Sequence, residues 1–248
     1  MAPIFVFLLI HWYISLFFQS FFYHRYAAHG LCSMSKGWER FFYACSYLTH
    51  GPSFMKTSAY AIMHRLHHAH TDEEEDPHSP HYSTNAMTLM LKTRNSYQDL
   101  VQQKITVEDK YKKDLPEWKW LERIGHNWVS RLIWALIYLG IYILLCTAWW
   151  QYLFLPLTIA ISAAQGLVVN WWAHKFGYEN YRLVNTSKNI IPVDLFFAGE
   201  AYHNNHHKHP GRANNAVKWF EVDPTYQLMR LMHRMKIIRL KNVTVKAE

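Results

Sequence analysis

The chain has 248 residues, of which 50% are hydrophobic and 17% aromatic, and its 26 Lys and Arg residues outnumber its 18 Asp and Glu residues. This length fits one domain, which we expect to cover residues 1–248. The mean hydropathy of −0.18 excludes a bundle of lipid-buried helices alone, and it predicts a few spanning helices that carry a large polar cap.

Three apolar stretches, residues 4–22, 132–149 and 152–172, are candidates for membrane-spanning helices. Each holds about 18 to 21 residues, which at ~1.5 Å per residue matches a hydrocarbon core of ~30 Å. All 26 Lys and Arg residues fall in the two other blocks, 23–131 and 173–248. Because basic residues stay on the cytoplasmic side of a membrane, we expect both blocks to form a cytosolic cap on a transmembrane stem.

The stretch 38–63 is also apolar, but Gly51 and Pro52 interrupt it and basic residues flank it. Its two halves, of about a dozen residues each, are too short to cross a bilayer. We therefore expect a helical pair that is either re-entrant or interfacial.

Two later segments of the cap are expected to be helical. Residues 104–123 alternate charged and aromatic side chains, as a surface helix does. Asp223 and Pro224 suit the N-cap and the first position of a helix. The segment 226–240 then predicts a basic amphipathic helix, which lies either on the cytoplasmic leaflet or against the cap.

Several of the seventeen histidines are grouped, and the groups follow apolar or helical segments. They are His24 with His29, then His64, His67 and His68, then His174 with Asn170 four residues before it, and finally His203, His206 and His207. Helix positions i, i+3 and i+4 share one face, so each His-x-x-His-His pattern is expected to project three imidazoles toward one point. A lone histidine is more often structural, but two such patterns on one membrane face predict a shared metal site.

The ligand type narrows the choice of metal. Nitrogen donors suit zinc, copper, iron and nickel, whereas magnesium and calcium prefer oxygen. Nine histidines exceed one tetrahedral zinc site, but they suit two metals with four or five nitrogens each and with open positions, as a catalytic site has. Iron is the natural choice for oxygen activation. The other eight histidines are not expected to be ligands.

The histidine groups resemble the boxes of the membrane fatty-acid desaturases, and specifically of bacterial relatives of the stearoyl-CoA (acyl-CoA Δ9) desaturases. The resemblance covers roughly residues 15–212. It rests on His24–His29, on His64–His68 with Asp76, Pro77 and His78 after it, on Asn170 with His174, and on Gly199–His207.

This resemblance implies an all-α membrane protein, in which a transmembrane stem carries a cytosolic helical cap with two iron ions. It implies that nine histidines bind the irons, with Asn170 acting through a water: His24, His29, His64, His67, His68, His174, His203, His206 and His207. Carboxylates should orient these imidazoles through their second nitrogen. The candidates are Glu200, Asp76, Asp72 and Asp194.

The implied activity is O2-dependent insertion of a cis double bond, at Δ9, into a long-chain acyl thioester. Acyl-CoA is the first expectation for the carrier, with a carrier protein or a glycerolipid as alternatives. Two electrons would come from a separate protein of the ferredoxin or cytochrome b5 type, which the basic cap suits, although the same charge suits anionic lipid. We expect a bacterial inner membrane, an active site facing the cytoplasm, and no nucleic-acid partner.

Two other function classes remain open on the sequence. A hydroxylase on the same scaffold, acting on an alkane, sterol or carotenoid, would use the same ligands. The Asp76–His78 segment and the Gly-Glu-x-x-His-x-x-His-His box favour a desaturase over it. A metal transporter or sensor would carry polar residues through its spans as a pathway, whereas only His11 lies within one.

Overall fold

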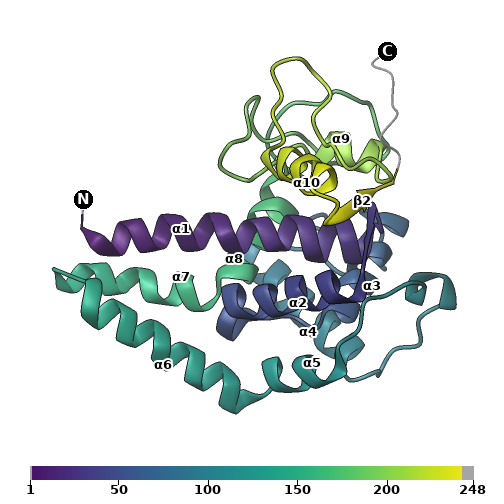
Figure 1. Ribbon diagram of the computed structural model, residues 1–248. Coiled ribbons are helices and arrows are strands. Elements are labelled where there is room, and N and C mark those ends of the chain that lie inside the picture. Colours follow the sequence, from purple (N-terminus) through teal and green to yellow (C-terminus); the bar gives the residue numbers. More distant parts are fainter. Residues whose placement is uncertain (1, 242–248) are drawn as a thin grey trace.

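Helices make up most of the computed structural model, which describes residues 2–241, and the longest non-helical segments are 70–85, 173–202 and 209–223. In chain order the elements are α1 (Pro3–Phe18), a π-helical continuation (Gln19–Ala28), β1 (Cys32–Met34), α2 (Lys36–His50), a 3-10 turn (Gly51–Ser53), α3 (Thr57–Ala69), α4 (Ala86–Val101), a 3-10 turn (Asp109–Lys112), α5 (Lys119–Gly125), α6 (Trp128–Leu145), a 3-10 turn (Trp149–Phe154), α7 (Leu155–Ile159), α8 (Ile161–Leu167), a π-helical turn (Val168–Trp172), α9 (His203–Lys208), α10 (Pro224–Arg234) and β2 (Ile238–Leu240). The expected all-α class is confirmed (Figure 1).

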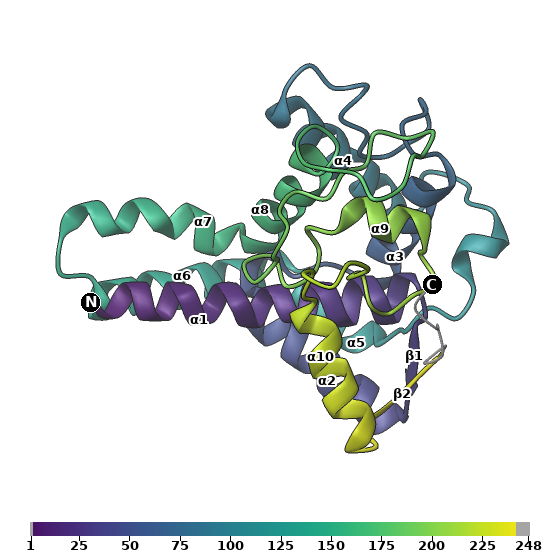
Figure 2. The ribbon, with the colours of Figure 1, turned by 90° about the horizontal axis from the view of Figure 1, so that it is seen from above.

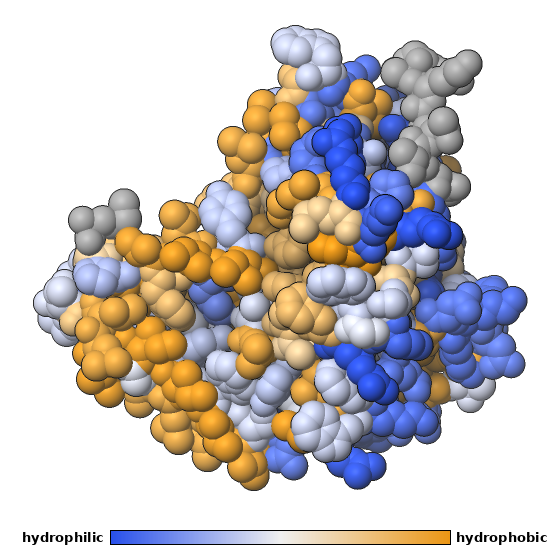
Figure 3. All heavy atoms as spheres, in the orientation of Figure 1, coloured by the Kyte–Doolittle hydropathy of each residue, from blue (hydrophilic) through white to orange (hydrophobic). Residues whose placement is uncertain are grey.

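A stem of α1, α6, α7 and α8 extends to one side of the molecule (Figures 1 and 2). Within residues 2–241, two helices are long and apolar enough to cross a membrane, Pro3–Ala28 and Trp128–Leu145. The helices α7 and α8, with their flanking turns, are bent by 77° relative to each other, and they make a third span if the bent pair is counted as one. Hydrophobic side chains gather over the stem (Figure 3). The remaining elements, which we call the cap, carry most of the hydrophilic side chains together with some hydrophobic ones.

The bend at Ala160 interrupts the third apolar stretch, which we expected to be one continuous helix. The backbone N–H of Ser162 donates a hydrogen bond to Ser53 Oγ at 3.3 Å, and the two serine hydroxyls lie 3.0 Å apart. A side chain that inserts between the hydrogen-bonded backbone groups of a helix replaces one of its i→i−4 hydrogen bonds and permits a sharp bend. The turn that contains Ser53 therefore caps α8.

The helices α2 and α3 form a helical pair whose connecting turn packs against the stem. α2 runs back along α1 (Figure 1), and the turn Gly51–Ser53 contacts α6. A Cβ atom on Gly51 would lie 2.8 Å from the Tyr138 hydroxyl, and Tyr138 is about 15 Å from the start of α6 at ~1.5 Å per residue. His11, in the middle of α1, lies 3.0 Å from the same hydroxyl. The turn between α2 and α3 therefore lies beside the middle of two stem helices, which supports the re-entrant one of the two arrangements expected for residues 38–63.

Aromatic packing fixes the end of the first long helix against α2. Phe21 and Phe22 are fully buried, and their rings meet Phe42 and Tyr43 with centroid distances of 5.0 and 5.2 Å. Burying a side chain of this size contributes about 1.5–3 kcal/mol. This core lies directly beneath the first histidine pair, so it sets the position of His24.

The C-terminal helix is shorter than its sequence suggests. Asp223 is its N-cap, as expected, because the Oδ1 atom accepts a backbone N–H of the first turn at 2.9 Å. The helix nevertheless ends at Arg234, since Lys236 adopts a φ of +61° that an α-helix cannot contain. Ile238–Leu240 then pairs antiparallel with Cys32–Met34. The expectation of a helix over 226–240 was therefore wrong for its last third.

The surface helix expected over residues 104–123 is also only partly present. The chain forms a 3-10 turn at Asp109–Lys112 and begins α5 at Lys119. Asp114 between them has a φ of +51°, and Pro116 has no backbone N–H to donate, so a continuous helix is excluded.

Replacing Gly51 by alanine should destabilise the re-entrant turn. Gly51 has a φ of +51°, and the added Cβ would meet the Tyr138 hydroxyl at 2.8 Å. We expect the free energy of unfolding in detergent to fall by about 1–3 kcal/mol. Gly140→Ala on α6 is the matched control, because nothing among the described residues lies within 4 Å of its added Cβ. Equal thermal midpoints for the two variants would contradict this account.

Candidate metal centre

The first histidine pair lies on π-helical turns, which its spacing alone does not predict. The backbone N–H of His29 donates to the carbonyl oxygen of His24 at 3.1 Å. Residues five apart point about 140° away from each other in an α-helix, whereas the i→i+5 bonding of a π-helix stacks them. Asn170 lies on a second π-helical turn, Val168–Trp172. Both box-bearing ends of the stem therefore use this rare geometry, which is frequent at functional sites.

The structure brings all nine predicted histidines together, but as two groups. The first group is His24, His29, His64, His68 and His206, and the second is His67, His174, His203 and His207. Within each group, the candidate ligand atoms lie within 4.8 Å of one another. The first group takes its members from the π-helical segment, α3 and α9, and the second takes its members from α3, α9 and the end of the last π-helical turn.

Each His-x-x-His-His pattern is divided between the two groups, so the expectation that it points to one place was wrong. Helix positions i and i+4 differ by about 40° in direction, whereas i+3 lies about 60° to the other side of i. His64 and His68 therefore stay together, and His67 turns to the second group. On α9 the same rule joins His203 with His207 and directs His206 to the first group.

The Nε2 atoms face one another at contact distance. The Nε2–Nε2 distances are 3.0 Å for His24 and His206, 2.8 Å for His29 and His64, and 3.0 Å for His174 and His203. Burial lowers the pKa of His64, His203 and His206 well below the usual imidazole value, so these rings are neutral near pH 7. A neutral ring that donates through Nδ1 has only a lone pair at Nε2. Converging lone pairs of this kind fit a metal cation, and nitrogen donors suit iron.

Buried carboxylates hold the outer nitrogens of some of these rings. His67 Nδ1 lies 3.0 and 2.9 Å from the two oxygens of Asp76, a residue with no exposed surface. His24 Nδ1 lies 2.8 Å from Glu200 Oε2. His174 Nδ1 is 3.7 Å from Asp72 Oδ2, and both contact the Thr186 hydroxyl, at 3.1 and 2.7 Å. Such contacts fix the tautomer and the orientation of each ring.

The carboxylates differ in their acidity. Burial raises the pKa of Asp76, although its contacts with His78 oppose this effect. Burial also acts to raise the pKa of Glu200, but the nearby charges of His24 and Arg25 and a hydrogen bond from Ser20 outweigh it and lower the pKa to about 2. Glu200 is therefore ionised at any physiological pH.

Asp194, the fourth predicted carboxylate, has a different position. Its oxygens accept hydrogen bonds from the backbone N–H groups of Phe197, Gly199 and Ala201 at 2.7–2.9 Å. Burial raises its pKa to about 6, against these hydrogen bonds. Asp194 thus shapes the loop that leads into α9 and does not orient an imidazole.

A buried arginine connects the first and third boxes, and the sequence reasoning missed it. Arg25 is 1% exposed and donates to both oxygens of Asp223 at 3.1 and 2.9 Å. It also lies 3.3 Å from Glu200 Oε1. An arginine next to His24, at the end of an apolar helix, was the available signal, because a charge there needs buried partners.

Two cavities adjoin the histidines. A small one, of about 60 Å³, is lined by Asn170, His78 and Tyr60 beside rings of both groups. His78 is 3% exposed, its ring lies 4.2 Å from that of His67, and sequence reasoning left it outside the site. The larger cavity, of about 330 Å³, shares Tyr60, Met63 and Asn170 with the small one and is mostly apolar. An acyl chain entering it would pass close to the histidines.

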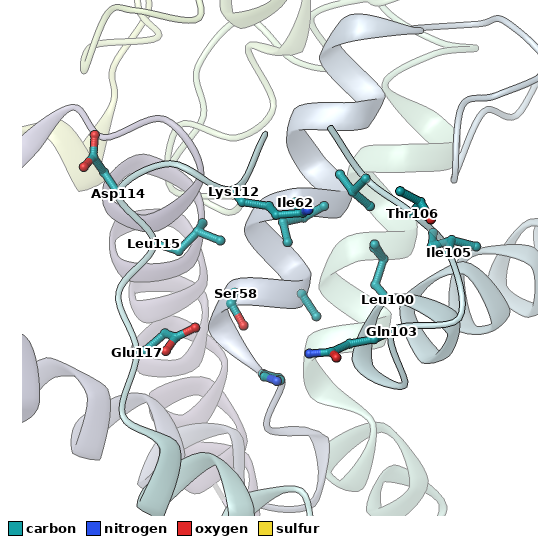
Figure 4. Close-up of a pocket in the computed structure, with 13 residues that line it drawn as sticks. Ser58, Ile62, Leu100, Gln103, Ile105, Thr106, Lys112, Asp114, Leu115 and Glu117 are labelled. Carbon is teal, nitrogen blue, oxygen red and sulfur yellow. The ribbon is translucent and has the colours of Figure 1, made fainter. Parts of the chain in front are cut away.

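A further cavity, of about 690 Å³, lies between α3, the end of α4 and the following loop (Figure 4). Ile62 of α3 and Leu100 of α4 form part of its apolar wall, and Lys112 and Glu117 give its rim both signs of charge. Ile62 and Ser58 project from α3 on a side that carries none of the nine histidines. This cavity is therefore separate from the metal site.

Comparison with known proteins gives one family. The family model described as "Fatty acid desaturase" matches residues 1–236. The chain is 27% identical to "Delta-9 desaturase-like 5 protein" of Arabidopsis thaliana over 86% of this chain and 68% of that protein. It is 27% identical to "Delta-9 acyl-lipid desaturase 1" of the same plant, over 85% and 66%. It is 26% identical to "sn-1 stearoyl-lipid 9-desaturase" of Anabaena variabilis, over 93% and 80%.

Neutralising Arg25 should strongly destabilise the protein. Arg25→Met leaves the carboxylates of Asp223 and Glu200 buried without their cation, which typically costs about 3–5 kcal/mol. Thermal unfolding in detergent measures the loss. Lys112→Met is the control, because Lys112 pairs with Asp109 and both side chains are exposed, and such surface pairs contribute ~0–1 kcal/mol. Similar losses for both variants would contradict the structural role of Arg25.

Proposed function

The chain belongs to the fatty acid desaturase family, and we propose that it inserts a cis double bond, at Δ9, into a long-chain acyl substrate. The balanced reaction converts one –CH2–CH2– unit, O2, two electrons and two protons into –CH=CH– and two waters. The observation that supports this most directly is the pair of histidine groups beside an apolar cavity. The resemblance of the boxes and the names of the relatives add the Δ9 position.

We propose that the nine histidines bind two iron ions, five around one and four around the other. Asn170 would complete the site through a water from the small cavity that it lines. Bound there, the irons would supply the O2 activation that removes hydrogen from an unactivated methylene. The chain's own part is to keep the Nε2 atoms unprotonated, to hold the ring orientations, and to exclude water from the apolar cavity.

The proposed orienting residues are Asp76, Glu200 and Asp72. Asp76 accepts a hydrogen bond from the Nδ1–H group of His67, which leaves the Nε2 atom of that ring free to bind a metal. Glu200, ionised at neutral pH, does the same for His24. Asp72 acts on His174 mainly through the Thr186 hydroxyl between them.

We place the stem in a bilayer and the cap on its cytoplasmic side, because all 26 Lys and Arg residues fall in the blocks 23–131 and 173–248. A bacterial inner membrane is the proposed location. The electrons would come from a separate ferredoxin or cytochrome b5 type protein. For the carrier of the acyl chain, coenzyme A is our proposal from the box pattern, and a glycerolipid is the alternative that the relatives' names favour.

Lipid analysis of cells that express the chain tests the activity. We expect a new cis double bond in long-chain acyl groups, and its absence when His67→Ala is expressed at the same level. His81→Ala is the control, since His81 is exposed and belongs to neither group. A hydroxylated product, or one zinc per purified chain in place of two irons, would contradict the proposal.

Asp76→Asn should weaken metal binding without removing a ligand. An amide accepts the Nδ1 hydrogen less strongly than a carboxylate does, so we expect a loss of about 10–100-fold in metal affinity. Competition with a chelator on the purified protein measures it. Glu75→Gln is the matched control, because Glu75 is exposed on the same loop. The role assigned to Asp76 is wrong if both variants keep the wild-type affinity.

A further inference from the structure

The larger apolar cavity opens between α4, α8 and the start of α6. Its volume of about 330 Å³ is within the usual range for ligand sites. Phe54, Met90 and Ile159 contribute to its apolar lining, and Asn170 lies where it adjoins the histidines. One end of this cavity adjoins the candidate metal centre. The residues that line the rest of the cavity are therefore those that the remainder of a bound substrate would contact.

Two arginines line this cavity, and neither is neutralised. Arg94 and Arg131 form no ion pair with a carboxylate within residues 2–241. Arg131 Nε is buried and has no hydrogen-bond partner among these residues, and the same holds for Thr93 Oγ1 on the cavity face of α4. A buried guanidinium N–H without a partner, such as Arg131 Nε, is costly unless an acceptor binds it, whereas Arg94 is exposed at the rim of the cavity. The planar donors of a guanidinium match a phosphate in particular.

The arginines lie at the depth where a head group would be found. Arg131 is the fourth residue of α6, one of the two long apolar helices, and its guanidinium carbon lies 5.9 Å from the ring centroid of Trp128. Trp128 is 81% exposed. Tryptophan and arginine at the end of a span are typical of the membrane–water interface. A chain in the cavity would thus have its polar end at the interface.

We propose that Arg94 and Arg131 bind the phosphate of the carrier to which the acyl chain is attached. This inference rests on the proposed function, and it adds the chemical class of the carrier. A phosphate is shared by two sources, a glycerophospholipid in the bilayer and coenzyme A in the cytosol. With the phosphate held at the rim, the length of the cavity sets which methylenes reach the histidines, so both arginines are positioning residues.

The test is equilibrium binding to the purified, metal-loaded chain without any electron donor, so that no turnover is required. The probes are distearoyl phosphatidylglycerol in detergent micelles, stearoyl-CoA, and the uncharged monostearoylglycerol. The variants are Arg94→Gln and Arg131→Gln, which remove the charge and keep most of the length. Lys92→Gln is the matched control on α4, because the Lys92 ammonium lies over the Tyr82 ring and the residue does not line the cavity.

We expect each arginine variant to bind a phosphate-bearing probe about tenfold more weakly, as the loss of a charged hydrogen bond predicts. Binding of monostearoylglycerol should not change, and Lys92→Gln should bind all probes as the wild type does. A loss confined to phosphatidylglycerol identifies a phospholipid carrier, and one confined to stearoyl-CoA identifies coenzyme A.

Unchanged binding in both arginine variants would overturn the inference. An equal loss for all three probes would overturn it as well, because the arginines would then only support the shape of the cavity. If the wild type discriminates between the probes as expected but forms no double bond in cells, the proposed function fails while the phosphate site stands.

Discussion

The convergence of nine imidazoles is the constraint on which the rest of the structure depends. The Nε2 atoms of facing rings lie 2.8–3.2 Å apart, where lone pairs repel unless a cation lies among them. Four segments far apart in sequence must bring them to the same place. Every long helix of the protein either carries one of these rings or positions a helix that does.

The Nδ1 atoms of the rings, which point away from the candidate metal positions, contact buried carboxylates that hold the cap together. Asp76 and Glu200 contact Nδ1 atoms, and Arg25 links Glu200 to Asp223 at the start of α10. A buried ion group of this kind is stabilising only when all of its partners are present. This group of buried charges therefore fixes the position of the first histidine box relative to the third.

The stem and the cap are coupled because the same helices belong to both. The helix that starts in the stem at Pro3 continues through His24 to Ala28, and the last bent pair carries Asn170 close to its end at Trp172. The re-entrant turn at Ser53 bends that last pair and so opens space for the apolar cavity beside it. The apolar cavity thus adjoins both the bent pair and the small cavity beside the histidines.

The sequence by itself determined the all-α class, the approximate spans and the nine clustered histidines, because hydropathy and box spacing are local signals. It did not determine how those histidines divide into two groups, since that depends on π-helical turns at His24 and on 40° and 60° differences around α3 and α9. Arg25, the position of Asp194 and the rim arginines were decided by tertiary structure alone. Arg25 depends on a partner more than a hundred residues away, Asp194 on the conformation of its own loop, and the rim arginines on a cavity between helices. Spacing along the chain carries no record of these.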